Sequence, residues 1–105
     1  MKYYAVAEMR LLHRAWVPAY VENVTKLVEA FGGRYLARTS SIEQIEGDRE
    51  SPHVFLLIEW PSREAALTFY VSPDYAPYRK ARLEGAQNHF WLIAGKDDTR
   101  EAQVP

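Results

Sequence analysis

The amino-acid sequence predicts an α+β fold, a mostly antiparallel sheet covered by helices, and three observations lead to this class. Residues 54–62 form the most apolar run in the chain, and a strand is expected over 53–60, typical of a mid-sheet strand with both faces covered. Residues 2–12 alternate between an apolar and a mixed face, which is the period of a strand. Residues 18–31 instead space their apolar side chains three and four positions apart, as an amphipathic helix does.

The first half of the chain predicts a strand, a helix and a hairpin. Pro18 suits the first helical position, where its missing N–H costs nothing, and Gly32-Gly33 suits the helix end. Residues 34–45 predict a second, more polar strand of the kind found at a sheet edge. A polar loop over 46–52 then leads into the apolar strand, so these two strands are expected to pair antiparallel.

Two helix starts follow the apolar strand. Ser62 is expected to cap a helix over 63–70. Ser72-Pro73-Asp74 predicts a second start, with a helix over 74–84 whose first turn Pro77 should disturb. Residues 88–95 predict the last strand, which is apolar on both faces.

The resulting order is β-α-β-β-α-(α)-β, which is the ferredoxin-like split βαβ arrangement. In that topology the first and third strands are central, which suits the apolar third strand, and the polar second strand lies at an edge. Residues 1–95 are expected to form one such domain and residues 96–105 a polar tail.

The charge balance narrows the possible partners. A net charge of −1 without a basic block argues against nucleic acid and against electrostatic binding to membranes. No apolar stretch approaches the ~20 residues that span a bilayer, and Glu8 and Arg10 interrupt any signal-like start. The chain has no cysteine, so a disulfide framework and a thiolate metal site are excluded, and a reducing cytoplasm is the expected location.

The sharpest candidate for chemistry is a pair of opposite charges, Arg38 and Glu59. A hairpin through 46–52 would place them nearly opposite each other on adjacent strands. If the face that carries Leu56 and Trp60 packs on the helices, both charges point into the space between two sheets of a dimer. Such a pair could orient a polar ligand group, or Glu59 could accept a proton. The alternative is an ion pair that only sets strand register.

Aromatic and basic side chains in the helical segment are the candidate ligand contacts. Tyr70, Tyr75 and Arg82 are expected to line the mouth of a cavity between the sheet and the helices, where tyrosine offers an apolar ring and one hydroxyl. The alternative for Tyr75 is core packing, and for Arg82 a solvated side chain or a helix cap. Ser72 is interpreted as a cap and not as a nucleophile, because no glycine-rich elbow surrounds it.

The histidines and glycines indicate no cofactor. His13, His53 and His89 should lie near one end of the sheet, where three imidazoles could hold a metal ion, but their spacing matches no known ligand motif. No metal site is therefore predicted. The glycines form neither a phosphate loop nor a dinucleotide fingerprint, so no cofactor is predicted either.

Three segments together resemble a small uncharacterised single-domain family of the dimeric α+β-barrel superfamily. They are residues 32–38, 58–62 and 69–75, with the sequences GGRYLAR, IEWPS and FYVSPDY, and the resemblance extends over roughly residues 3–95. It implies that two ferredoxin-like subunits pack sheet to sheet. The superfamily includes cofactor-free monooxygenases, small-ring isomerases and haem-degrading enzymes, but the family itself has no agreed activity. Asn88 and Trp91 resemble the amide and aromatic side chains of the oxygenases by residue type only. On this ground Trp91 is a further candidate ligand contact, and the alternative for it is core packing.

The leading hypothesis is therefore a homodimer that binds or transforms a small, partly apolar organic molecule, with Arg38 and Glu59 as polar anchors. If it is an enzyme, the resemblance favours a cofactor-independent monooxygenase or isomerase. The two alternatives are a non-catalytic ligand sensor or carrier that uses the same cavity, and a purely structural dimer.

Overall fold

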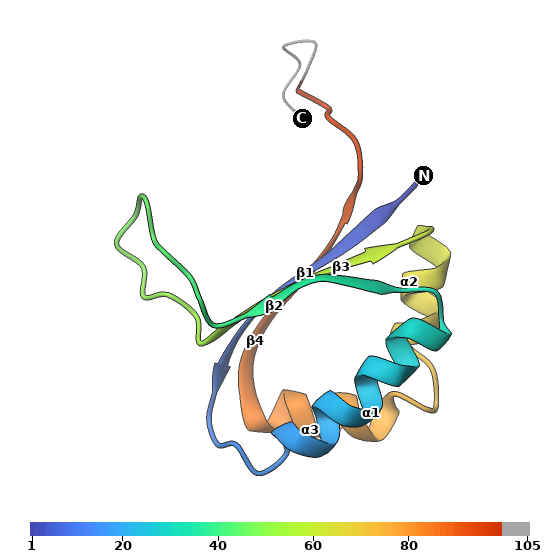
Figure 1. Cartoon of the computed structure of the whole chain (residues 1–105), viewed down its shortest axis with the longest axis horizontal. Coiled ribbons are helices and arrows are strands. Elements are labelled where there is room, and N and C mark those ends of the chain that lie inside the picture. The colour runs from blue at the N-terminus through green and yellow to red at the C-terminus, as the bar shows by residue number, and fades with distance from the viewer. Residues whose placement is uncertain (100–105) are drawn as a thin grey trace.

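A computed structural model describes residues 1–99 of the chain, and within them a curved four-stranded antiparallel sheet wraps around three helices (Figure 1). The strand order is β2-β3-β1-β4, so the first and third strands are central, as predicted. This is the ferredoxin-like arrangement. The elements are β1 (Tyr3–Leu11), α1 (Val17–Ala30), β2 (Arg34–Thr39), β3 (Val54–Trp60), α2 (Arg63–Tyr70), α3 (Ala76–Gly85) and β4 (Ala86–Ala94). Of the predicted tail, residues 100–105 lie outside the described part.

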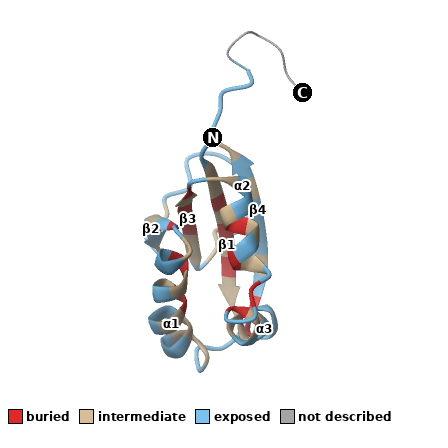
Figure 2. Cartoon of the chain, turned by 90° about the vertical axis from the view of Figure 1, so that its right-hand side faces the viewer, coloured by how far each residue is buried: buried red, intermediate tan, exposed pale blue. Residues whose placement is uncertain are grey.

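The core lies between the inner face of the sheet and the helices, and Figure 2 shows buried positions along β1 and β3 behind the helices. In the central strands every second residue points inward, because side chains alternate between the faces of a strand. Ala5 and Ala7 are both 1% exposed, and such small side chains leave room for what packs against them. Trp60, also 1% exposed, is the largest side chain of this core.

The helix boundaries follow the predicted signals. The Ser62 side chain caps α2 by accepting a hydrogen bond from the Ala65 N–H at 3.0 Å, as predicted. Gly32 follows α1 with φ of +96°, a left-handed conformation that glycine adopts without strain. The helix predicted over 74–84 begins later, at Ala76, because the Ser72 hydroxyl closes a turn by accepting from the Tyr75 N–H. Pro77 thus falls in the first turn of α3, where a proline is tolerated, and does not disturb the helix.

The β2–β3 hairpin differs from the prediction in two ways. The strand predicted over 34–45 ends at Thr39, whose hydroxyl accepts a hydrogen bond from the Ser41 N–H and turns the chain out of the sheet. The connecting loop therefore runs over residues 40–53 and projects from one end of the sheet (Figure 1). In addition, the pairing of β2 with β3 shifts register between Tyr35 and Ala37, which is the signature of a β-bulge.

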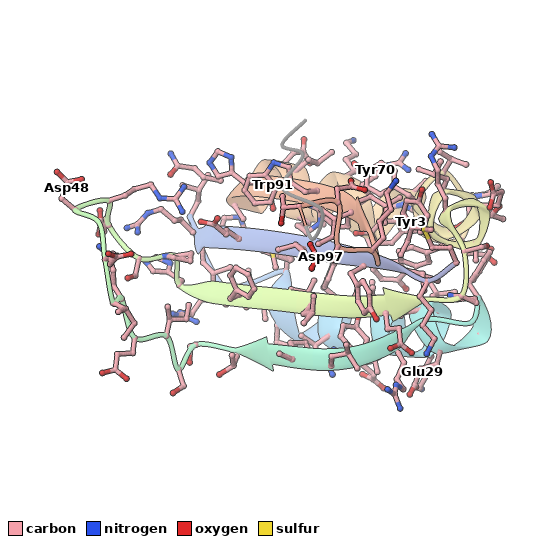
Figure 3. The ribbon with its side chains drawn as sticks, turned by 90° about the horizontal axis from the view of Figure 1, so that it is seen from above. Tyr3, Glu29, Asp48, Tyr70, Trp91 and Asp97 are labelled. Atoms are coloured by element: carbon pink, nitrogen blue, oxygen red, sulfur yellow. The ribbon has the colours of Figure 1, made fainter. Side chains whose placement is uncertain are left out.

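No helix within residues 1–99 covers the outer face of the sheet, on which Trp91 lies (Figure 3). The central part of this face is apolar. We call it the open face and define it by six side chains: Tyr4, Val6, Phe55, Leu57, Trp91 and Ile93. Charged pairs border it at both ends, namely Glu59 with Lys2 at 3.0 Å and Glu8 with Arg49 at 2.8 Å. An apolar strip with charged margins has the composition of a protein–protein interface. None of the described helices has the length and apolarity needed to cross a bilayer.

Candidate functional site

A cavity of about 210 Å³ lies between the inner face of the sheet and the helices. Aromatic rings make up much of its wall, and they come from α1, β2, the end of β3, α2, the residue before α3, and β4. Its aliphatic floor is contributed by the central strands. The aromatic side chains on the wall are Tyr20, Tyr35, Trp60, Phe69, Tyr70, Tyr75 and Phe90. A cavity of this kind suits a flat, mostly apolar molecule that can accept a few hydrogen bonds.

A second, larger hollow of about 400 Å³ lies beside the first. The two share Tyr20, Tyr35 and Leu56 in their linings, so a ligand in one would contact the wall of the other. Arg38 lines this second hollow, together with His53. The hollow therefore adds a charged group at the α1 side of the apolar cavity.

A buried polar cluster borders the apolar cavity at the junction of α1, α3 and β4. The hydroxyls of Tyr20 and Tyr75 are 2.6 Å apart, and the Arg82 Nε donates to the Tyr75 hydroxyl at 3.2 Å. Arg82 also donates from its NH1 nitrogen to the Asn88 amide oxygen at 2.9 Å. Tyr75 is 1% exposed and Arg82 2%, so these two side chains are almost completely shielded from solvent, while Tyr20 and Asn88 are half-buried.

The electrostatics of this cluster are unusual because it holds a cation without a carboxylate. Arg82 forms none of the ion pairs found among residues 1–99, and its NH2 nitrogen is buried with no hydrogen-bond partner. A buried guanidinium stays protonated in proteins, so its charge is only partly compensated by neutral dipoles. Burial is the largest cause that raises the pKa of Tyr20 well above its ordinary value, and the neighbouring Tyr75 is the next. The Tyr20 hydroxyl is therefore protonated at neutral pH.

The predicted pairing of Arg38 with Glu59 is wrong. Because β2 ends at Thr39, it pairs with β3 in a different register from the predicted one: Arg34 lies opposite Glu59 on the outer face, and Arg38 lies opposite Leu56 on the inner face. The β-bulge between Tyr35 and Ala37 is what puts the two arginines on different faces. Glu59 lies on the outer face as predicted, with Lys2 at 3.0 Å and Arg34 at 3.7 Å. Arg38 instead donates to the Thr25 hydroxyl of α1 at 2.6 Å and lies 4.0 Å above the Tyr35 ring. The two charges therefore belong to opposite faces of the sheet.

The other predicted residues also separate into two groups. Tyr70 and Tyr75 both line the apolar cavity. Arg82 does not line it but donates a hydrogen bond to the Tyr75 hydroxyl. Trp91 lies on the open face, 44% exposed and stacked on His89, and it lines neither hollow. The structure thus brings the three residues of the helical segment together and leaves Trp91 on the far side of the sheet.

Tyr20 is the contributor that sequence reasoning missed. It lines both hollows and bonds to Tyr75. A signal was present, because Tyr20, Val24 and Val28 follow each other at four-residue steps and form one inward stripe of α1. Three- and four-residue apolar spacing alone favours a stripe through Val21, Val24 and Phe31, but Val21 is 42% exposed.

The histidines serve other contacts. His53 Nδ1 accepts a hydrogen bond from the Leu11 backbone N–H at 2.9 Å, which occupies one of its two ring nitrogens. His89 lies on the outer face against Trp91. Among the described residues no three histidine, cysteine, aspartate or glutamate side chains gather in a way that could hold a metal ion.

Fold and cavity together define a ferredoxin-like α+β protein whose helices enclose a small aromatic pocket against the sheet. Residues 2–96 match the family described as a domain of unknown function, DUF1330, and the chain belongs to this family. The sequence matches no curated protein.

Solved structures of similar shape come from several bacteria. A protein of unknown function from Rhodopseudomonas palustris superposes with a TM-score of 0.74 at 19% identity, covering 91% of this chain and 83% of its own. A dimeric ferredoxin-like protein of unknown function from Jannaschia gives 0.62 at 9% identity, covering 90% and 99%. SnoaB, a cofactor-independent oxygenase from Streptomyces nogalater, gives 0.53 at 16% identity, covering 94% and 97%. At these identities the likeness establishes the shared fold.

Proposed function

We propose that this protein binds a small, partly apolar organic molecule in the cavity between sheet and helices. If the protein is an enzyme, the same cavity is where this molecule is transformed. The observation that carries the proposal is the 210 Å³ cavity itself, walled by aromatic rings and bordered by the hydroxyls of Tyr20 and Tyr75. Native cores are close-packed, and a space this size next to unsatisfied donors is a property of binding sites. The cofactor-independent oxygenase among the structural neighbours supports cofactor-free chemistry as the first activity to test.

The predicted site residues take different parts in this proposal. Tyr70 and Tyr75 contact the ligand body, and Arg38 contacts any polar extension that enters the neighbouring hollow. Glu59 and Trp91 lie on the other side of the sheet, and we assign them to the contact between subunits. Glu59 then has the structural role of an ion pair with Lys2 and Arg34 at the margin of that contact.

We also propose that two copies associate through the open face. A sheet with one apolar face uncovered must bury it elsewhere, and a second identical face offers a self-complementary partner. The dimeric protein from Jannaschia has the same fold, which supports this arrangement. Because the chain has no cysteine, we place the dimer in a reducing cytoplasm.

A thermal-shift screen tests ligand binding. A ligand that binds only the folded protein raises its stability, by about 2.7 kcal/mol at a concentration of roughly 100 times its dissociation constant. We expect small cyclic compounds from a metabolite library to raise the melting temperature of the wild type. The variant Ala66→Leu, which extends a cavity-lining side chain, should lose this response. Ala19→Leu makes the same change at an exposed position of α1 and should keep it.

The outcomes separate the alternatives. Turnover of quinols, lactones or haem by the wild type, lost in Ala66→Leu, identifies an enzyme. Thermal shifts without turnover identify a sensor or carrier. If no compound shifts the wild type, or if Ala66→Leu responds as the wild type does, the cavity is not a binding site and the protein is a structural dimer.

A further inference from the structure

The buried cluster of Tyr20, Tyr75 and Arg82 has more hydrogen-bond donors than acceptors, and this excess specifies a ligand group. Two hydroxyl protons are available to the tyrosine pair, and one of them is used in the bond between the two oxygens. The Tyr75 oxygen already accepts from Arg82 Nε. Whichever tyrosine donates to the other, one hydroxyl proton is left without an acceptor among the described residues. The free NH2 nitrogen of Arg82 adds further unused donors.

The same cluster carries a positive charge that nothing in the described chain neutralises. The partners of the Arg82 guanidinium are the Tyr75 hydroxyl, the Asn88 amide and the ring of Phe90, 5.5 Å away, and all three are neutral. A tyrosinate does not supply the missing charge, since burial keeps Tyr20 protonated. A buried cation is stable when an anion with hydrogen-bonding oxygens lies beside it.

The cluster adjoins the cavity and is not an isolated feature of the core. Tyr20, Tyr75 and Phe90 all belong to the cavity lining, and Arg82 is in contact with two of them. The cavity volume of about 210 Å³ is below the roughly 300 Å³ at which pockets for drug-sized ligands begin, so the ligand is a small one. Apart from this corner the lining is apolar and largely aromatic.

We propose that the ligand is a small cyclic organic acid, whose carboxylate lies against the Tyr20 and Tyr75 hydroxyls and whose ring fills the aromatic cavity. The Arg82 guanidinium supplies the positive charge behind the hydroxyls and fixes the position of the Tyr75 oxygen. This inference rests on the proposed ligand-binding function and specifies its ligand class. It assigns Arg82 as a positioning residue and Tyr20 as a direct ligand contact.

Matched pairs of acids and amides test the carboxylate. Benzoate, phenylacetate and 2-naphthoate would each be compared by calorimetry with the corresponding primary amide, which has nearly the same shape and no charge. We expect the wild type to bind at least one acid about tenfold or more tightly than its amide, as hydrogen bonds to charged groups would give. Tyr20→Phe should weaken the acid and leave the amide nearly unchanged.

Two substitutions that each remove one positive charge show whether the preference for the acid depends on the charge of Arg82 or only on the net charge of the protein. Arg82→Met should reduce the acid-to-amide preference to about one. Lys80→Met removes the same charge from an exposed position of the same helix and should keep the preference. If Arg82→Met does not fold, Tyr20→Phe and the wild-type preference still decide the inference, because neither measurement requires Arg82 to be replaced.

The results distinguish a failure of the carboxylate inference from a failure of the proposed ligand-binding function. Equal affinity for acid and amide overturns the carboxylate and leaves the cavity as a binding site. A preference that survives in both Arg82→Met and Tyr20→Phe also overturns it. If none of the acids binds while a neutral library compound does, the ligand class is wrong and the proposed function stands. If nothing binds the wild type at all, both are overturned.

Discussion

Removing the indole of Trp91 should break the proposed dimer. The side chain is 44% exposed at the centre of β4, which corresponds to about 110 Å² if a tryptophan offers roughly 250 Å² in all. Covering that area is worth about 2.7 kcal/mol at about 25 cal/mol per Å². In a two-fold dimer each substitution acts twice, so Trp91→Ala removes up to about 5 kcal/mol of association free energy. Alanine still covers part of the area, and we expect the dissociation constant to rise about a hundredfold or more.

Sedimentation velocity over a dilution series measures this change directly. The wild type should sediment as a dimer at micromolar concentration, and Trp91→Ala should shift toward the monomer in the same range. Leu83→Ala is the matched control, because Leu83 is also an exposed large apolar residue, 53% exposed, but lies on α3 in the helical layer. It should leave the dimer unchanged.

Two results would refute the reasoning. A wild type that is monomeric at every concentration would show that the open face remains uncovered. A Trp91→Ala variant that dimerises as the wild type does, with Leu83→Ala weakened instead, would move the interface to the helical layer. Circular dichroism of each variant confirms that the comparison is made between folded proteins.

The remaining predictions concern the cluster and the helix–sheet contact. Because the folded-state pKa of Tyr20 is raised above its ordinary value of 10, the unfolded chain loses this proton first as the pH rises. Folding stability should therefore be unaffected by Tyr20 below about pH 10 and fall above it, by up to about 1.4 kcal/mol per pH unit. Tyr20→Phe should reduce that fall in urea unfolding between about pH 9 and pH 11, and an unchanged slope would contradict the burial of this hydroxyl. Gly33→Ala would place a Cβ 2.7 Å from Val28 and 2.9 Å from Trp60, so it should destabilise by about 1–3 kcal/mol. A melting temperature equal to that of the wild type would show that the contact between α1 and β3 is looser than described.

Local signals in the sequence were sufficient for the fold. Alternation in β1, the four-residue steps of α1 and the cap at Ser62 depend on backbone geometry within a few residues, and they identified the elements in the right order. The connection lengths and the contrast between an apolar third strand and a polar second strand then placed β1 and β3 at the centre. The DUF1330 match agrees with the resemblance found in three short motifs.

The site could be predicted only in part, because its geometry depends on contacts between distant segments. Tyr70 and Tyr75 could be placed near a cavity from their position after the third strand. Arg82 has the sequence context of a solvated helix residue, and its burial follows from the docking of α3 against β4 and Tyr20. Nothing within a few residues of Arg82 encodes that environment.

The sequence by itself determined the order of the elements and the two central strands, since these depend on local periodicity and on backbone preferences of proline, glycine and serine. Only the tertiary structure decided which side chains share a site. The bulge of β2 places Arg34, opposite Glu59, and Arg38, opposite Leu56, on different faces of the sheet, although four-residue spacing in a regular strand would put both on the same face. The side of the sheet on which Trp91 lies is set by its pairing with Val6, and the cluster around Arg82 exists only where three separate elements meet.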